Sequence, residues 1–343
     1  MCGKQWNFSA SFLKRGILEA VLTISAIMLI PFRSFACSYC YVSPGAMTAE
    51  EGESISSGAM LNSPTASTMQ KGRSAAGFTY GYARYNAMPA EDAHMLHEEG
   101  RDIHGKRYEN SYHLYFDYGV MDDLDVYFIA PYVSSALAQV HDEDNIGRKE
   151  RAFGFGDASL MGKYRFWKKY FEAALIAGVK FPTGETSLKD KSQNKFAPEQ
   201  QPGSGSWDGE LGIALSRSFQ RRFSLSGSFQ YILKGEGSQD FKAGDILRFS
   251  LGSSVSLRRP GEYPNLSLSL ELNNEWVGRD HSGEEDKVFD SGGTTLFVTP
   301  GLNVNIARNL SVFLGAPVPV HQNLGGEHEE TKYKLLTGAS VYF

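Results

Sequence analysis

Long hydrophobic runs are almost absent from this sequence, which excludes one class of membrane protein. Hydrophobic residues make up 41% of the 343 residues, yet only the stretch from Gly16 to Phe32 is continuously apolar apart from Glu19. A polytopic helical membrane protein needs several runs of about 20 apolar residues. A membrane β-barrel needs none, because the alternating residues of its strands average to mild hydrophilicity, and the mean hydropathy is −0.31.

An excess of basic residues is also missing. The chain has 34 Lys and Arg against 39 Asp and Glu, which gives a net charge of −5. A nucleic-acid partner is therefore not expected. The hydrophobic content in turn excludes a chain that is disordered throughout.

Cysteine is scarce, with three residues in the whole chain. Cys37 and Cys40 form a Cys-x-x-Cys pair, for which an exported protein predicts one local disulfide. A redox pair and half of a metal site are the alternatives. Tyr41 follows Cys40 where c-type haem attachment requires His, so that attachment is not supported.

The first 36 residues have the order of a secretory signal peptide. Lys14 and Arg15 precede the apolar stretch, and Ser34-Phe35-Ala36 then supplies small residues at the two positions that signal peptidase reads. We expect cleavage after Ala36. An uncleaved anchor helix and a lipoprotein site at Cys37 are the alternatives.

The rest of the chain carries the period of two residues that is typical of half-buried strands. From Phe223 to Leu233, large apolar residues alternate with Ser224, Ser226, Ser228 and Gln230. The pattern predicts about twelve strands, with short turns at one end and long polar loops at the other, as in outer-membrane barrels. The expected strands are residues 76–87, 109–119, 123–135, 154–167, 170–181, 204–217, 222–234, 242–257, 265–277, 292–306, 310–320 and 332–343.

The fold class predicted from these features is all-β, a closed transmembrane antiparallel β-barrel with short periplasmic turns and long outer loops. The last expected strand ends on the aromatic Phe343, in phase with its apolar face. This ending resembles the sorting signal that the barrel-assembly machinery reads. We therefore predict three parts: a signal peptide over residues 1–36, a periplasmic segment or plug over residues 37–75, and an outer-membrane barrel over residues 76–343.

Charged residues on the polar faces of the expected strands would line the lumen, because a Lys or Arg facing lipid at the membrane midplane costs about 2–4 kcal/mol. They would act in solute selectivity or form a structural network of ion pairs. These residues are His113, Asp117, Asp125, Lys163, Arg165, Glu172, Lys180, Glu210, Arg248, Glu271 and Glu275.

Histidines gather in the expected outer loops among carboxylates, a combination that can bind divalent metals. No fixed spacing of metal ligands accompanies them, so the alternative is an acidic surface that divalent ions bridge to lipopolysaccharide. The candidate metal ligands are His94, His97, His104, His141, His281 and His328, and His321 lies in the last of these loops. No other cofactor is expected.

Several phrases of the sequence together resemble a known family. They are Gly154-Phe155-Gly156-Asp157, Lys180-Phe181-Pro182-Thr183-Gly184, Gly203-Ser204-Gly205-Ser206 and Gly315-Ala316-Pro317-Val318-Pro319-Val320. Their order and spacing resemble the outer-membrane transporters named after the meta-pathway of phenol degradation, over most of residues 110–343. The resemblance implies a β-barrel channel of a Gram-negative bacterium and supplies no catalytic motif.

The function predicted from the sequence is an outer-membrane channel for small solutes, with no enzymatic activity. A structural or partner-binding barrel is the alternative. A lipid-modifying enzyme is less favoured, because no Gly-x-Ser-x-Gly nucleophile elbow is present.

Overall fold

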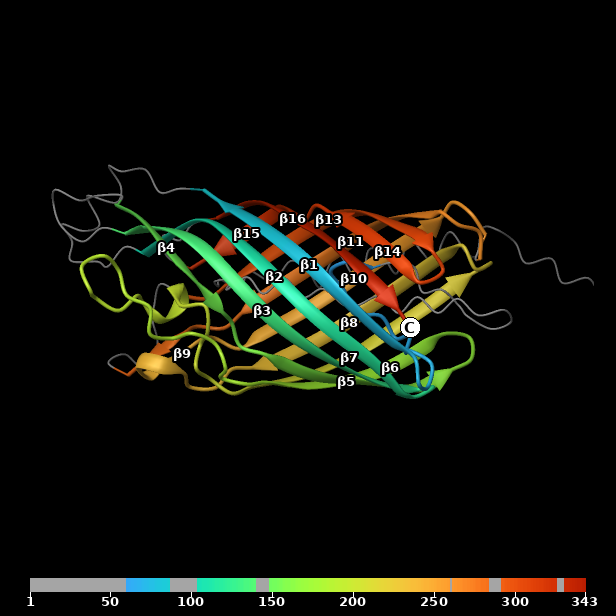
Figure 1. Cartoon of the computed structure of the whole chain (residues 1–343), viewed down its shortest axis with the longest axis horizontal. Helices are drawn as coiled ribbons and strands as arrows, with labels where there is room; N and C mark the ends of the chain where they lie inside the picture. Colours follow the sequence, from blue (N-terminus) through green and yellow to red (C-terminus); the bar gives the residue numbers. More distant parts are fainter. Residues whose placement is uncertain (1–59, 87–103, 140–147, 260, 284–290, 326–329) are drawn as a thin grey trace, which may run out of the picture. The chain divides into compact units, whose positions relative to one another are not determined.

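The computed structural model describes residues 60–86, 104–139, 148–259, 261–283, 291–325 and 330–343. Its main element is one antiparallel sheet that closes on itself (Figure 1). The first strand pairs with the last, since Ala75 lies opposite Tyr342 and Tyr85 opposite Thr331. The ring is completed where Asn265 pairs with Asn305 and Val277 with Gly293. Every strand of a closed barrel has neighbours on both sides, which a strand in lipid requires.

The barrel wall has twelve staves, each a single strand or two consecutive strands that together span the wall. This confirms the predicted fold class and strand number. Two staves consist of two shorter strands each. The staves are β1 (Ser74–Tyr85), β2 (His104–Met121), β3 (Leu124–Gln139), β4 (Arg148–Phe155) followed by β5 (Ser159–Lys168), β6 (Glu172–Lys180), β7 (Asp208–Phe219), β8 (Phe223–Leu233), β10 (Ile246–Ser256), β11 (Asn265–Val277), β13 (Gly293–Ala307), β14 (Leu310–Gly315) followed by β15 (Val318–Leu324), and β16 (Thr331–Tyr342).

Outside the wall lie a few short elements. β9 (Phe241–Lys242) and β12 (His281–Ser282) pair in a small two-stranded sheet between neighbouring staves. The 3-10 helices η1 (Pro198–Gln200) and η2 (Ser238–Asp240) lie in two of the connections. Among the described residues, none of the helices has the length and apolar character needed to cross a membrane.

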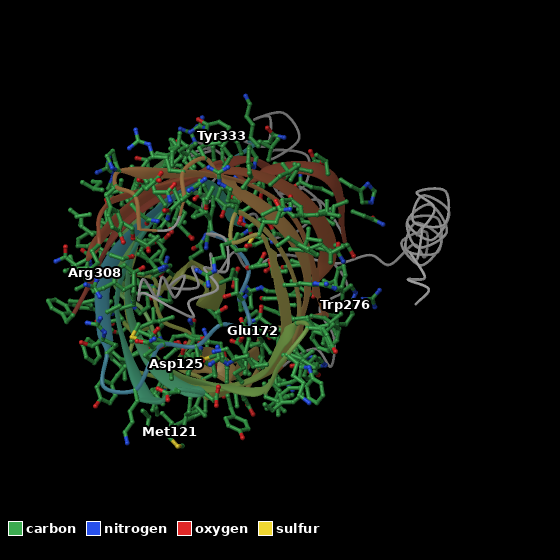
Figure 2. All side chains as sticks on the ribbon, turned by 90° about the vertical axis from the view of Figure 1, so that its right-hand side faces the viewer. Met121, Asp125, Glu172, Trp276, Arg308 and Tyr333 are labelled. Atoms are coloured by element: carbon green, nitrogen blue, oxygen red, sulfur yellow. The ribbon has the colours of Figure 1, made fainter. Side chains whose placement is uncertain are left out.

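Alternation along each stave separates an apolar outer face from a polar inner face. On β8, Leu225, Phe229 and Leu233 are exposed, whereas Ser224, Ser228 and Gln230 between them are buried. Figure 2 shows the same division along the barrel axis, with Asp125 and Glu172 inside the ring of strands and Met121 outside it. The outer face is therefore suited to lipid and the inner face to a polar lumen.

Two breaks in the wall differ from the expected strands. The fourth stave starts at Arg148 and is interrupted at residues 156–158, and the eleventh is interrupted at residues 316 and 317 and extends to Leu324. Residues 204–207, expected to begin a strand, precede β7 without forming one. At the first break, Gly156 N still donates to Pro131 O at 2.9 Å, so the staves remain joined across it.

Candidate functional site

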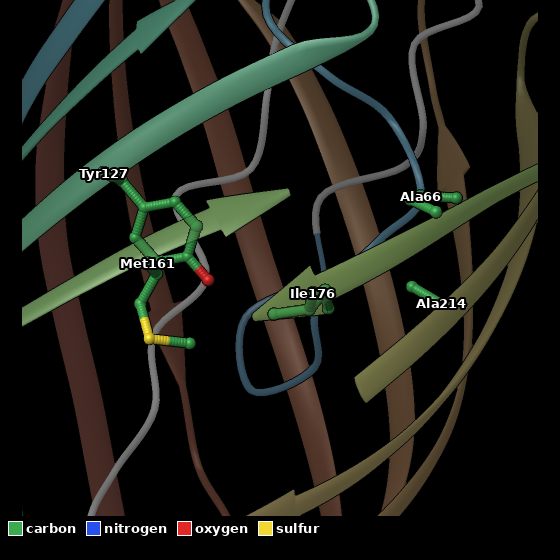
Figure 3. Packing of buried hydrophobic residues seen from close by; sticks show 6 residues of the cluster. Ala66, Tyr127, Met161, Ile176 and Ala214 are labelled. Atoms are coloured by element: carbon green, nitrogen blue, oxygen red, sulfur yellow. The ribbon is translucent and has the colours of Figure 1, made fainter. Parts of the chain in front are cut away.

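Residues 60–70, which we call the strap, lie inside the barrel ahead of β1. Nine of these eleven residues are buried, and Asn62 and Gln70 are half-buried. Figure 3 shows Ala66 of the strap over the wall residues Ile176 and Ala214, in one apolar cluster with Tyr127 and Met161. The strap therefore packs directly on the inner face of the wall.

Carboxylates of three different staves hold the strap in place. On β11, Glu271 accepts hydrogen bonds from Leu61 N at 2.5 Å and Ser63 Oγ at 2.6 Å. On β6, Glu172 accepts from Ser67 Oγ at 2.7 Å. On β3, Asp125 accepts from Met69 N at 3.1 Å. Backbone N–H groups bonded to charged carboxylates form stronger hydrogen bonds than neutral pairs do, so the strap is fastened from β11 to β3.

A second segment enters the lumen from the opposite end. Residues 181–207, here called the inner loop, connect β6 to β7. Phe196 of this loop packs against Leu137 and Ala152 of β3 and β4, which face inward with their register partners. Five residues earlier in the loop, Lys191 N donates to Glu150 at 3.2 Å. The amide of Gln239, between β8 and β10, donates to Phe196 O at 3.1 Å. The loop thus reaches from β3 and β4 to the β8–β10 connection.

The base of the inner loop is held by Asp157, in the break of the fourth stave. Its carboxylate accepts hydrogen bonds from Lys180 Nζ at 2.8 Å, Gly184 N at 2.9 Å and Ser204 N at 2.8 Å. Three of the phrases that carry the family resemblance thus meet at one carboxylate. Sequence analysis recognised the phrases but did not place Asp157 among the lumen residues.

A chain of ion pairs extends from this point across the wall. Lys180 Nζ lies 3.0 Å from Asp208 Oδ2, and Lys234 Nζ lies 2.8 Å from the same oxygen. Sequence analysis did not include Asp208 and Lys234 among the lumen residues, although both lie in expected strands and share the inward phase of Glu210 and Gln230. The pairing reaches from the fourth stave to β8.

The structure places nearly all of the predicted lumen residues in buried positions on the inner face of the wall. Ten of the eleven are buried and Glu210 is half-buried. Several pair with each other: Lys163 with Asp125 at 3.4 Å, Arg165 with Glu172 at 3.0 Å, and Arg248 with Glu275 at 2.6 Å. Glu210 accepts a hydrogen bond from Gln230. His113 and Asp117 are buried in β2. A role of these residues in selectivity stays a prediction.

A cavity lies in the lumen between the strap and the inner loop. Its volume is about 80 Å³. Met161 and Ile129 bound it beside the cluster under the strap, and Asp157 and Lys180 bound it beside the inner loop. Charged groups of Glu210 and Arg248 complete a lining that also includes His113, Ile232 and Ile246. An apolar cavity with a few convergent polar groups is the usual form of a small-molecule site.

The predicted metal ligands lie mostly outside the described residues. This holds for His94, His97, His141 and His328, and for the Cys37 and Cys40 pair. His104 begins β2, His281 lies in β12, and His321 is exposed on β15. Within the described ranges, no three His, Cys, Asp or Glu side chains lie together in a way that could hold a metal ion. Metal capture by the outer loops therefore has no support from the described residues.

The barrel, with its apolar outer face and a lumen that two inward segments narrow, defines a transmembrane β-barrel protein of the outer-membrane type. The family model described as "Putative MetA-pathway of phenol degradation" matches residues 108–323, which is more than half of the chain. The chain belongs to this family. The family that the sequence phrases indicate is thereby confirmed.

A solved outer-membrane channel shares the fold. The COG4313 outer membrane channel from Pseudomonas putida F1 is similar with a TM-score of 0.60 and 14% identity, over 83% of this chain and 100% of that one. The NanC porin is similar with a TM-score of 0.42 and 6% identity, over 78% of this chain and 98% of that one. Among curated proteins, none matches the sequence.

Proposed function

We propose that the protein is an outer-membrane channel for small solutes, with the strap as the element that closes it. The observation that carries this proposal is the cavity in the lumen, which wall residues line between the apolar cluster under the strap and Asp157 and Lys180 at the base of the inner loop. A structural barrel needs no such space. Side chains alone fill the interior of small barrels, whereas larger barrels enclose cavities or channels.

The strap is suited to a movable closure because most of its hydrogen bonds join it to wall side chains. Glu271, Glu172 and Asp125 would exchange the strap's donors for water if the strap left. The barrel ladder itself does not depend on residues 60–70, since β1 begins at Ser74. Removal of the strap would thus open the lumen without removing a stave.

The remaining parts of the chain fit export to the outer membrane. We propose residues 1–36 as the signal peptide, residues 37–75 as a periplasmic segment whose end is the strap, and residues 76–343 as the barrel. The two ends of the barrel would then face the periplasm with short turns and the exterior with long loops. Lipid and lipopolysaccharide would surround the outer face, and Phe343 would be read by the barrel-assembly machinery.

Single-channel conductance in planar bilayers tests the proposal. The mature chain is compared with a variant that lacks the strap, residues 60–70, after heat-modifiable gel mobility has shown that both barrels are folded. We expect brief or small conductance steps from the intact chain and larger, steady steps from the variant. A folded variant that stays silent would contradict a channel role and favour the structural or partner-binding barrel.

A further inference from the structure

Lys334 is a cation inside the barrel at a place where its charge is not neutralised. It lies on β16 opposite Ala83 of β1, and both side chains are buried on the inner face of the wall. Only 6% of Lys334 is exposed. Lys332 and Tyr333, its neighbours in β16, are exposed.

The other buried cations of the described residues all have a carboxylate partner. Lys163 pairs with Asp125, Arg165 with Glu172, Lys180 with Asp157 and Arg248 with Glu275. Within the part of the chain that the structure describes, no carboxylate lies within ion-pair distance of Lys334. The nearest inward carboxylate in the register is Glu109, two strands away beyond Ala83. Glu109 is already bound to Lys106 Nζ at 3.0 Å and to Ser135 Oγ at 3.2 Å.

An aromatic ring occupies the position where a carboxylate would be expected. Lys334 Nζ lies 4.5 Å from the ring centroid of Phe297, a buried residue of β13. A cation is attracted to the face of an aromatic ring at this distance. The attraction is weaker than an ion pair in the same surroundings, and it leaves the hydrogen-bond donors of the ammonium group available to a ligand.

The wall beside Lys334 is irregular. The eleventh stave is broken here, and Lys334 N donates to Pro317 O at 2.9 Å at the end of the break. Pro319 follows on β15, opposite Phe297. Pro319 is therefore the register partner of the ring that lies beside the ammonium group.

Along β16, Lys334 lies on the loop side of the cavity. Four residues further along β16, Gly338 stands opposite Thr79, which lines the cavity. Four residues of a strand span about 13 Å. A solute held at Lys334 would therefore lie about 13 Å along the wall from the cavity lining, on the same side of the barrel.

We propose that Lys334 and Phe297 form a binding site for a small organic anion, a monocarboxylate with an apolar body. The carboxylate would bind the ammonium group as a charge-assisted hydrogen-bonded pair, and the apolar body would lie against Phe297 and Pro319. This proposal rests on the proposed function in one respect: the solute must be able to enter the lumen. The paired cations of the cavity are neutralised already and do not offer the same site.

Calorimetric titration of the folded barrel in detergent with benzoate tests the site without any need for conduction. The matched variants are Lys334→Gln, Lys334→Arg and Lys332→Gln, the last an exposed lysine two residues away on the same strand. We expect Lys334→Gln to weaken benzoate binding at least tenfold, whereas Lys334→Arg and Lys332→Gln stay within about threefold of the unchanged barrel. Benzyl alcohol, which has a similar body and no charge, should bind at least tenfold more weakly than benzoate.

The other outcomes overturn the proposal. Benzoate that binds Lys334→Gln as tightly as the unchanged barrel, or that does not bind the folded barrel at all, would exclude Lys334 as the site. Acetate or chloride that competes as well as benzoate would show a simple anion site without a role for the apolar body. Phe297→Leu separates the two residues, because loss of the ring should weaken benzoate more than acetate. Since these are binding measurements, a barrel that binds benzoate and conducts no ions would reject the channel and keep the site.

Discussion

Asp157 and Lys180 join the break in the fourth stave to the end of β6, with 2.8 Å between the carboxylate oxygen Oδ2 and the ammonium nitrogen. Both side chains are buried. The same carboxylate accepts hydrogen bonds from the backbone at Gly184 and Ser204, the two ends of the inner loop. The pair therefore fixes the loop at its base, while the loop itself narrows the lumen.

Replacement of Asp157 by Ala should lower stability and loosen the inner loop. Removing one member of a buried ion pair leaves the other charge without a partner, at a cost of about 3–5 kcal/mol. Lys180 keeps Asp208 as a partner, so we expect a loss of about 2–4 kcal/mol. Urea unfolding of the barrel in lipid vesicles measures it. Asp123→Ala is the control, because this half-exposed carboxylate pairs with Arg165 near the surface and its loss should cost about 1 kcal/mol or less. Equal losses in the two variants would contradict a special role of Asp157.

Gly203→Ala should displace the inner loop without any change of charge. A Cβ at Gly203 would lie 2.6 Å from the backbone of Gly184 and 3.0 Å from Asp157 Oδ1. Forced overlap in a packed site costs about 1–3 kcal/mol. Gly209→Ala is the control, since a Cβ there meets nothing within 4 Å. The midpoint of thermal unfolding should fall for the first variant and stay within about a degree for the second, and similar midpoints would argue against close packing at Gly203.

Glu271→Ala should free the end of the strap that lies on β11. This carboxylate is fully buried and binds Leu61 and Ser63 of the strap. Because the strap keeps its contacts with Glu172 and Asp125, we expect transient openings rather than a permanently open barrel. Bilayer recordings should show more frequent large conductance steps than in the unchanged protein. Asn274→Ala, on the outward face of the same strand, should leave the recordings unchanged.

The stability of one outer connection should depend on pH through Asp280. Burial, the largest cause, and the charge of Glu199 raise the pKa of Asp280 to about 6, against an ordinary value of 3.8. The folded protein then binds a proton that the unfolded chain does not bind between about pH 6 and pH 4, so this group stabilises the fold as the pH falls through that window. Asp280→Asn keeps an acceptor for Gly244 N and removes the charge. The unfolding free energy of the variant should exceed that of the unchanged protein by about 3 kcal/mol at pH 8 and by almost nothing at pH 3.5. The difference between the two unfolding free energies at each pH measures this effect, and a difference independent of pH would contradict it.

The barrel was predictable because its staves obey a local rule. Alternation from Phe223 to Leu233 identified β8 and its two faces from neighbouring residues alone. The same alternation in β10 and β11 placed Arg248 and Glu271 on the polar, inward face. Strand ends were predicted less well where the alternation continues weakly into a loop. The fourth stave begins at Arg148, six residues before its predicted start.

The contacts of the strap and of the inner loop were not predictable from such a rule. The strap has neither alternation nor helical periodicity, because its neighbours are wall side chains and not a strand ladder. Phe196 stands in a polar stretch and is buried only because the inner loop turns back on β3 and β4. The pairing of Asp157 with Lys180 joins the two open ends of the β5–β6 hairpin, where Ser159 lies opposite Lys180, so it depends on the register of that hairpin and not on alternation within either strand.

The strap also sets an order for the assembly of the protein. It precedes every stave in the chain, yet its partner Glu271 lies 210 residues after Leu61. Its hydrogen bonds to Glu271 can therefore form only when β11 has taken its place, whereas those to Glu172 and Asp125 need only β6 and β3. Contacts between such distant residues slow folding. The strap, which is synthesised before every strand of the wall, is thus among the last segments to reach its native surroundings.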